Sequence, residues 1–257
     1  HSIPPTSVAV LQTREYIYEP TSALREGSPV DIVVPRLVDE MYDFMTARLL
    51  QRFRVTKNNG NVAQGADIVS VVNDIDNGLW KDARLEMNGE MVCHSNNMHG
   101  YQNLISHLIH DSDEMLTSEG AMRLLYKDTA GAMDSTAAST PNPQGLIAGD
   151  DWVLNNAGNA YEGSSDDARY GNHGLYQRFL HTQLSREVET FAPIGLDVFE
   201  QERYLLPNMK LRLTRQDHEF MLMSATKDAY KLELLDVKLH IHKVTPAPGI
   251  VAGLDAA

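Results

Sequence analysis

The strongest constraint on this chain is the alternation of apolar and polar side chains over residues 195–244. Apolar residues occupy every second position at 209–213, and a similar alternation returns over 232–241 after a short apolar run at 220–223. A period of two is typical of a strand on an antiparallel sheet, with one face against the core and the other in water. Pro207-Asn208 supplies a turn between two of these runs. The stretch therefore predicts the closing strands of a β-sandwich.

The earlier part of the chain carries more strand patterns, separated by turn residues. Asn88-Gly89 is the strongest hairpin signal, because this dipeptide readily adopts the positive φ angles of a two-residue turn. Strands are predicted over residues 14–20, 28–34, 43–56, 68–75 and 187–191, and on either side of the hairpin within 83–92. Eight or nine strands favour a mainly β fold, a jelly-roll (Greek-key) antiparallel β-sandwich with short helices in the connections. Periodicity alone leaves an immunoglobulin-like sandwich or another β-barrel open.

Helical spacing appears only in the connections. Over residues 99–111, the apolar residues Leu104, Ile105, Leu108 and Ile109 have the spacing of an amphipathic helix. Further short helices are predicted after Ser118 and over residues 175–186.

The domain organisation follows from where these patterns stop. Residues 1–13 contain prolines and little pattern, and they predict an N-terminal arm. Residues 14–244 form a single jelly-roll domain in this interpretation. A long loop insertion at 131–172, dense in Ser, Asn, Asp, Gly and Pro, interrupts it. Residues 245–257 predict a tail, or a linker toward a possible second jelly roll.

Composition excludes several classes of protein. Hydrophobic residues make up 42% of the 257 residues, so a core can form and global disorder is excluded. The formal net charge of −13 argues against nonspecific binding to nucleic acid, because such binding needs clustered Lys and Arg. No stretch approaches the ~20 apolar residues of a membrane span. Cys93 is the one cysteine, so an intrachain disulfide is impossible.

No residues stand out as catalytic, cofactor-binding or metal-binding, and no cofactor is expected. Cys93 lies close to His94 and His99, but these residues do not complete a zinc site, and a small buried side chain at a strand end is favoured. His240 and His242 share a face of one strand, as in a cupin-type metal site, yet a third ligand is missing and Lys238 on the same face would repel a cation.

Other candidate ligand groups are equally incomplete. His107 and His110 can share a helix face, but a wet helix edge is the favoured interpretation. Acidic residues cluster without the glycine and spacing of a calcium loop, and solvated charge is favoured for Asp111, Asp113, Glu114, Asp150, Asp151, Asp166 and Asp167. Phosphate-binding loops, nucleophile elbows and zinc-protease motifs do not occur in the sequence.

Several segments together resemble one family. The most specific are LLYKDTAGAMD at 124–134 and LDVFEQERYLLPNMKLRLTRQDHEFMLMS at 196–224; the others are YEPTSALREGSPVDIVVP at 18–35, LEMNGEMV at 85–92 and YKLELLDVKLHIHKV at 230–244. In this order they resemble the N-terminal half of the major capsid proteins of Polinton/Maverick-type elements and adintovirus-like DNA viruses. The resemblance spans most of residues 16–244.

The resemblance implies a jelly roll of the double-jelly-roll capsid lineage and a structural role in the virion, without catalytic residues. It implies self-association into trimers that contact neighbouring capsomers of an icosahedral shell, and contacts with minor capsid proteins. Members of the family continue into a second jelly roll, whereas this sequence stops at Ala257. A fragment, a second jelly roll on a separate chain, and a single-jelly-roll capsid protein are all compatible with that length.

Two other functions remain as alternatives, because a β-sandwich does not by itself decide function. The first is a carbohydrate-binding, lectin-like sandwich in which Trp152, Tyr161 or Tyr170 on the long loop stacks on sugar rings. The second is a cupin-type metalloenzyme that uses His240 and His242.

Overall fold

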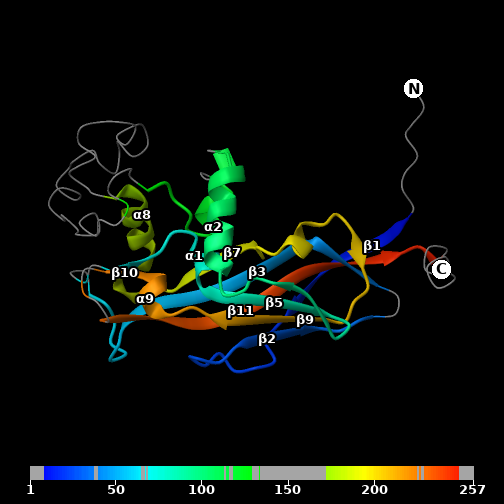
Figure 1. Ribbon diagram of the computed structural model, residues 1–257, viewed down its shortest axis with the longest axis horizontal. Coiled ribbons are helices and arrows are strands. Elements are labelled where there is room, and N and C mark those ends of the chain that lie inside the picture. The colour runs from blue at the N-terminus through cyan, green and yellow to red at the C-terminus, as the bar shows by residue number, and fades with distance from the viewer. Residues whose placement is uncertain are drawn as a thin grey trace.

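A computed structural model describes residues 9–37, 40–64, 67, 69–112, 114–115, 118–128, 133, 172–224, 226 and 229–248. A five-stranded and a four-stranded antiparallel sheet pack face to face, and helices rise from one side of them (Figure 1). None of the helices in this part of the chain has the length and hydropathy that crossing a membrane requires.

Eight strands form the main body of the two sheets, and the short strand β8 (Tyr204–Leu205) pairs at the side of β3. The eight are β1 (Val10–Tyr18), β2 (Val30–Val34), β3 (Met41–Lys57), β5 (Trp80–Met87), β6 (Glu90–His94), β7 (Val188–Pro193), β9 (Met209–Arg215) and β11 (Tyr230–Pro246). One sheet has the order β1-β11-β3-β7 and the other β2-β9-β5-β6. Within each sheet every neighbouring pair is antiparallel.

This strand order is that of a jelly roll. Numbered along the chain, the first strand pairs with the eighth, the second with the seventh, the third with the sixth and the fourth with the fifth. Such pairing is one long antiparallel hairpin, and rolling it over brings the eighth strand beside the third and the seventh beside the fourth. The predicted jelly-roll sandwich is thus confirmed, and the immunoglobulin-like order is not the one found.

The core lies between the two sheets and is fully apolar at its centre. Strand β9 contributes Met209, Leu211 and Leu213, which alternate with partly exposed residues as the sequence pattern predicts. Strand β11 keeps its core face despite an irregular pattern, because a β-bulge interrupts its pairing with β3 at Leu234/Asp236, and the pairing is irregular again at His240/His242. The bulge adds a residue to β11 and so shifts which of its positions face the core, from Leu234 to Val237.

At one end of the sandwich a lysine is enclosed by tyrosines. Lys243 is 5% exposed, and its Nζ lies 3.6 Å from the centroid of the Tyr16 ring. The rings of Tyr18 and Tyr42 are each 5.5 Å away, and the Glu40 carboxylate is 3.7 Å away. The tyrosine faces and the carboxylate together compensate for the loss of hydration around the ammonium group.

The connections carry the helices and the short strands. Their bounds are α1 (Ile75–Gly78), α2 (His99–His110), α4 (Glu119–Met122), α8 (His173–Thr182), α9 (His218–Met221), β4 (Val69–Val71), β8 (Tyr204–Leu205), β10 (Leu222–Ser224) and the 3₁₀ turns η2 (Gln183–Ser185) and η3 (Asp197–Glu200). Strands β4 and β10 pair with each other, so two connections that are distant in sequence meet at one end of the sandwich.

Most predicted elements are present, with corrected boundaries. The first strand starts at Val10, inside the predicted arm, and the last continues to Pro246. The apolar run at 68–75 is a strand over only three residues, because the chain then turns into α1 through Asp74 with a positive φ of 52°. The apolar run at 220–223, predicted as a strand, is divided between two elements. Phe220 and Met221 end α9, and Leu222 and Met223 begin β10. The loop predicted at 131–172 lies outside the described residues, apart from Met133 and Asn172.

Candidate functional site

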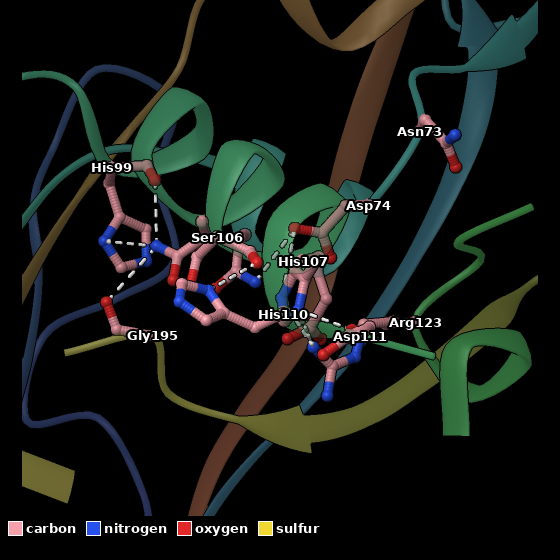
Figure 2. A network of polar contacts seen from close by, with 12 residues as sticks. Asn73, Asp74, His99, Ser106, His107, His110, Asp111, Arg123 and Gly195 are labelled. Carbon is pink, nitrogen blue, oxygen red and sulfur yellow. Dashed lines mark hydrogen bonds and ion pairs between the residues drawn. The ribbon is translucent and has the colours of Figure 1, made fainter. Parts of the chain in front are cut away.

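The chemically richest region lies where α1, α2 and α4 meet the sheet that contains β3 and β7. Figure 2 shows the polar contacts at α2, which connect its side chains to Asp74, Arg123 and Gly195. We call the buried and half-buried set at this junction the polar cluster; it comprises Gln51, Asp74, Asp76, Asn77, His107, Asp111, Arg123 and Thr190.

Asp76 ties α1 to the sheet. Its Oδ1 accepts hydrogen bonds from Gln51 Nε2 on β3 at 2.7 Å and from Thr190 Oγ1 on β7 at 2.8 Å. Gln51 Nε2 also donates to the Asp76 carbonyl at 3.0 Å. Asp76 is buried, and burial raises the pKa of its carboxyl group to about 6. Its two hydrogen-bond donors limit this rise, because they stabilise the ionised form.

Asp74 is also buried in this junction. Burial raises the pKa of its carboxyl group to about 8, against the effect of the hydrogen bond that Asn77 Nδ2 donates to Oδ2 at 3.0 Å. The Asp76 carboxylate raises the pKa further by repulsion. Asp74 is therefore protonated at neutral pH, as expected for a carboxyl group removed from water beside a second one.

His107 links α2 to Arg123, at the end of α4. Arg123 Nη1 lies 2.6 Å from His107 Nε2, and an arginine only donates, so Nε2 accepts. His107 Nδ1 then carries the proton and donates to Asp111 Oδ2 at 2.9 Å. Burial lowers the pKa of His107, and the positive charge of Arg123 lowers it further. The ring is thus held in one neutral tautomer.

The N-terminal half of α2 is fixed to the segment after β7. Asn103 Nδ2 donates to the His99 carbonyl at 2.8 Å and to the Gly195 carbonyl at 3.2 Å. A Cβ at Gly195 would lie 1.7 Å from Asn103 Oδ1, so only glycine allows this approach. Burial lowers the pKa of His99 to about 4, so its ring is neutral as well.

These contacts connect α1 to strands β3 and β7, and α2 to Arg123. Some of the hydrogen bonds lie within one connection, such as that from His107 to Asp111, whereas those that Asp76 accepts from Gln51 and Thr190 join α1 to two strands and so fix its position on the sheet. Among the described residues, His, Cys, Asp and Glu side chains form no group of three or more that is placed to hold a metal.

A second polar contact anchors α8, which sequence analysis did not single out. Arg178 is completely buried, and its Nε donates to the Val71 carbonyl at 2.9 Å while Nη2 donates to Asp128 Oδ1 at 3.1 Å. Sequence spacing carries no signal for this pair, because the two charged residues are 50 positions apart.

The face that carries His240 and His242 is occupied by ion pairs and ring contacts. His240 Nδ1 lies 2.8 Å from Glu15 Oε1, and its ring meets that of Phe191 edge-on at 5.2 Å. Lys238 Nζ lies 3.2 Å from Asp236 Oδ2. Cys93 is half-buried, and burial raises the pKa of its thiol, which disfavours the reactive thiolate.

The aromatic residues of the lectin-like alternative, Trp152, Tyr161 and Tyr170, lie outside the described residues. So do Asp113, Asp150, Asp151, Asp166 and Asp167.

The helix at 99–111 is present, but its faces are the reverse of those of an ordinary surface helix. The predicted wet edge at His107 is wrong, because this side chain is only 17% exposed and faces Arg123. His110 is exposed, as predicted. The apolar residues Ile105, Leu108 and Ile109 point to solvent instead, and polar side chains take the inner face because they meet polar partners there.

Comparison with known proteins supports the fold. No protein-family model and no curated protein sequence matches the chain. Among solved structures, the chain is similar to the Faustovirus major capsid protein, with a TM-score of 0.53 and 11% identity over 98% of this chain and 57% of that one. It is also similar to the PBCV-1 virus capsid, with a TM-score of 0.51 and 9% identity over 98% of this chain and 46% of that one.

A third similar structure comes from the Sputnik virophage, with a TM-score of 0.50 and 10% identity over 96% of this chain and 50% of that one. The chain therefore spans about half the length of the solved proteins that it matches. At these identities the similarity establishes a shared jelly-roll fold. The Faustovirus and PBCV-1 structures are those of viral capsid proteins.

Proposed function

We propose that this protein is a structural capsid subunit without enzymatic activity. The observation that carries the proposal is the jelly-roll strand order, together with a structural similarity to the Faustovirus major capsid protein that covers 98% of this chain. A rigid sandwich with helices clamped at its connections is suited to a shell, because it presents fixed surfaces to several neighbours at once.

More specifically, we propose that the protein forms trimeric capsomers, which tile the icosahedral virion shell of a DNA virus or of a Polinton-type or adintovirus-like element. The sequence motifs at 124–134 and 196–224 support that assignment. The half-length match supports a second jelly roll, on the same polypeptide or on another chain, as part of the capsomer. The net charge of −13 favours a shell protein that does not itself bind the genome.

The test is the native mass of the purified chain, measured by light scattering after gel filtration over a range of concentrations, with electron micrographs of each peak. A trimer or a closed particle is the expected result. A monomer at every concentration, with no particles, would contradict self-assembly of this chain. A glycan array and metal analysis then test the lectin-like and cupin-type alternatives directly.

A further inference from the structure

The outward side of α2 carries exposed apolar side chains from one end to the other, with Gln102 also exposed beside them. Met98, Tyr101, Ile105 and Leu108 follow one another at intervals of 3, 4 and 3 residues, and Ile109 lies beside them. Their exposed fractions are 52, 50, 55, 68 and 70% in chain order. Spacing of this kind places side chains in one line on a helix, and it is the spacing of the contact seam between two helices. We call these five residues the α2 stripe.

The helix also lacks permanent charge. None of its twelve residues is Asp, Glu, Lys or Arg, although charged residues make up 22% of the chain. A helix whose outer face meets water ordinarily carries charged residues there. Loss of charged residues together with enrichment in Tyr and Met is typical of the centre of a protein–protein interface.

The inner face of α2 shows that the exposure is built into the fold. The polar side is held inward by the hydrogen bond from Asn103 Nδ2 to the Gly195 carbonyl and by the contact between His107 and Arg123. The helix cannot turn its apolar side toward the core without breaking both contacts. The stripe is therefore presented outward by specific interactions on the opposite face.

The size of the stripe is sufficient for a specific contact. Five large side chains, each with on the order of 200 Å² of surface and somewhat more than half of it exposed, offer roughly 600 Å². Two such surfaces bury about 1,200 Å² in total, which is the lower end of the range for specific interfaces.

We propose that the α2 stripe is a contact between copies of this chain, in which the α2 helices of neighbouring copies pack stripe against stripe around a shared symmetry axis. The inference rests on the proposed self-assembly and assigns the surface that mediates it. Each copy carries a formal charge of −13, so copies repel one another over much of their surface, and an uncharged patch is where they approach with least repulsion. A seam with heptad spacing fits a second helix, and a symmetric assembly supplies the same helix from each neighbour.

The first test places a charge in the contact. Leu108→Glu puts a carboxylate at an exposed position, so the monomer keeps its fold, which circular dichroism verifies. In the assembly the charge is removed from water beside its own copies, and we expect the midpoint concentration for assembly to rise by ~100-fold or more. Val62→Glu is the matched control, because Val62 is 61% exposed and lies outside α2.

The second test measures proximity without relying on mass. Leu108→Cys is made in a Cys93→Ser background, which leaves one thiol in each chain. Mild oxidation of the assembled protein is expected to join two copies through this thiol, whereas Val62→Cys in the same background stays unlinked. In the dilute monomer, a maleimide reagent is expected to label the Leu108→Cys thiol rapidly.

The outcomes separate this inference from the proposed function. If the wild type assembles, Leu108→Glu does not, and the Leu108→Cys thiols cross-link, the contact is established. If the wild type assembles but Leu108→Glu assembles equally well and Leu108→Cys stays unlinked, the contact is refuted while the capsid function stands. Slow labelling in the monomer would also refute it, since the stripe would then be covered within one chain. A wild type that stays monomeric refutes the proposed self-assembly, and the contact with it.

Discussion

Replacing Asp76 with asparagine should increase the stability of the fold at neutral and alkaline pH. The asparagine keeps Oδ1 as an acceptor for Gln51 Nε2 and Thr190 Oγ1, which lie at 2.7 and 2.8 Å from this atom in the wild type. What it removes is the charge. Asp76→Asn therefore isolates the cost of ionising a carboxyl group at this buried position.

The magnitude follows from the pKa. Burial raises the pKa of Asp76 from 3.8 to about 6, so the folded state binds its proton more tightly than the unfolded state does. Stability then falls as pH rises from the unfolded pKa through the folded one. A difference of about two units at ~1.4 kcal/mol each corresponds to about 3 kcal/mol above pH 7. At pH 4 and below the wild type and Asp76→Asn should differ little for this reason.

The assay is urea unfolding at steps from pH 4 to pH 8, at one fixed protein concentration because assembly also contributes to apparent stability. The unfolding free energy of Asp76→Asn minus that of the wild type should rise by about 3 kcal/mol across this range. Asp31→Asn is the control of opposite kind, because the hydrogen bond from Arg212 lowers the pKa of Asp31. Its difference from the wild type should be constant above about pH 5. A difference for Asp76→Asn that is flat or falls with pH would refute the reasoning.

Three further substitutions test the packing. Arg178→Met should lower the free energy of unfolding in urea by about 3–5 kcal/mol, because it leaves the Asp128 carboxylate without its arginine partner. Asp128→Asn should have a smaller effect, and equal stability of Arg178→Met and the wild type would contradict this account. Gly195→Ala should lower the melting temperature by several degrees, because its Cβ would collide with the Asn103 side chain. The same change in an Asn103→Ala background should lower the melting temperature much less. Additive effects of the two substitutions would show that the clash is not the cause. Lys243→Met should cost about 1–2 kcal/mol through loss of the contact with the tyrosine rings, and a more stable variant would show that burying the ammonium group outweighs that contact.

Local patterns were enough to predict most of the sandwich. The alternation at 209–213 became β9, and Asn88-Gly89 joins β5 to β6 with both residues at positive φ, at 53° and 89°. Such signals work because side chains alternate across a strand and because few residues tolerate these turn angles. The pattern did not predict the type of element at 68–75 and 220–223. A short apolar run is compatible with a buried strand and with a buried helix, and each of these runs is part strand and part helix.

The candidate site shows where local pattern stops being sufficient. Asp74 and Asp76 looked like ordinary polar residues at the end of a strand, and nothing near them in sequence indicates burial. Arg123 reaches the same junction from a separate connection, and Thr190 is 114 positions from Asp76. Their pKa values follow from this enclosure, and the enclosure exists only when distant connections meet.

The amino-acid sequence by itself determined most of the strands and the existence of the helix at 99–110, because both follow from the period of apolar residues along a short stretch. Only the tertiary structure decided which way that helix faces. The period places Ile105 and Leu108 on one side and His107 near the other, but it does not say which side meets the protein. Arg123 and Gly195 supply polar partners on the inner side, so the polar face is turned inward and the apolar face is left exposed.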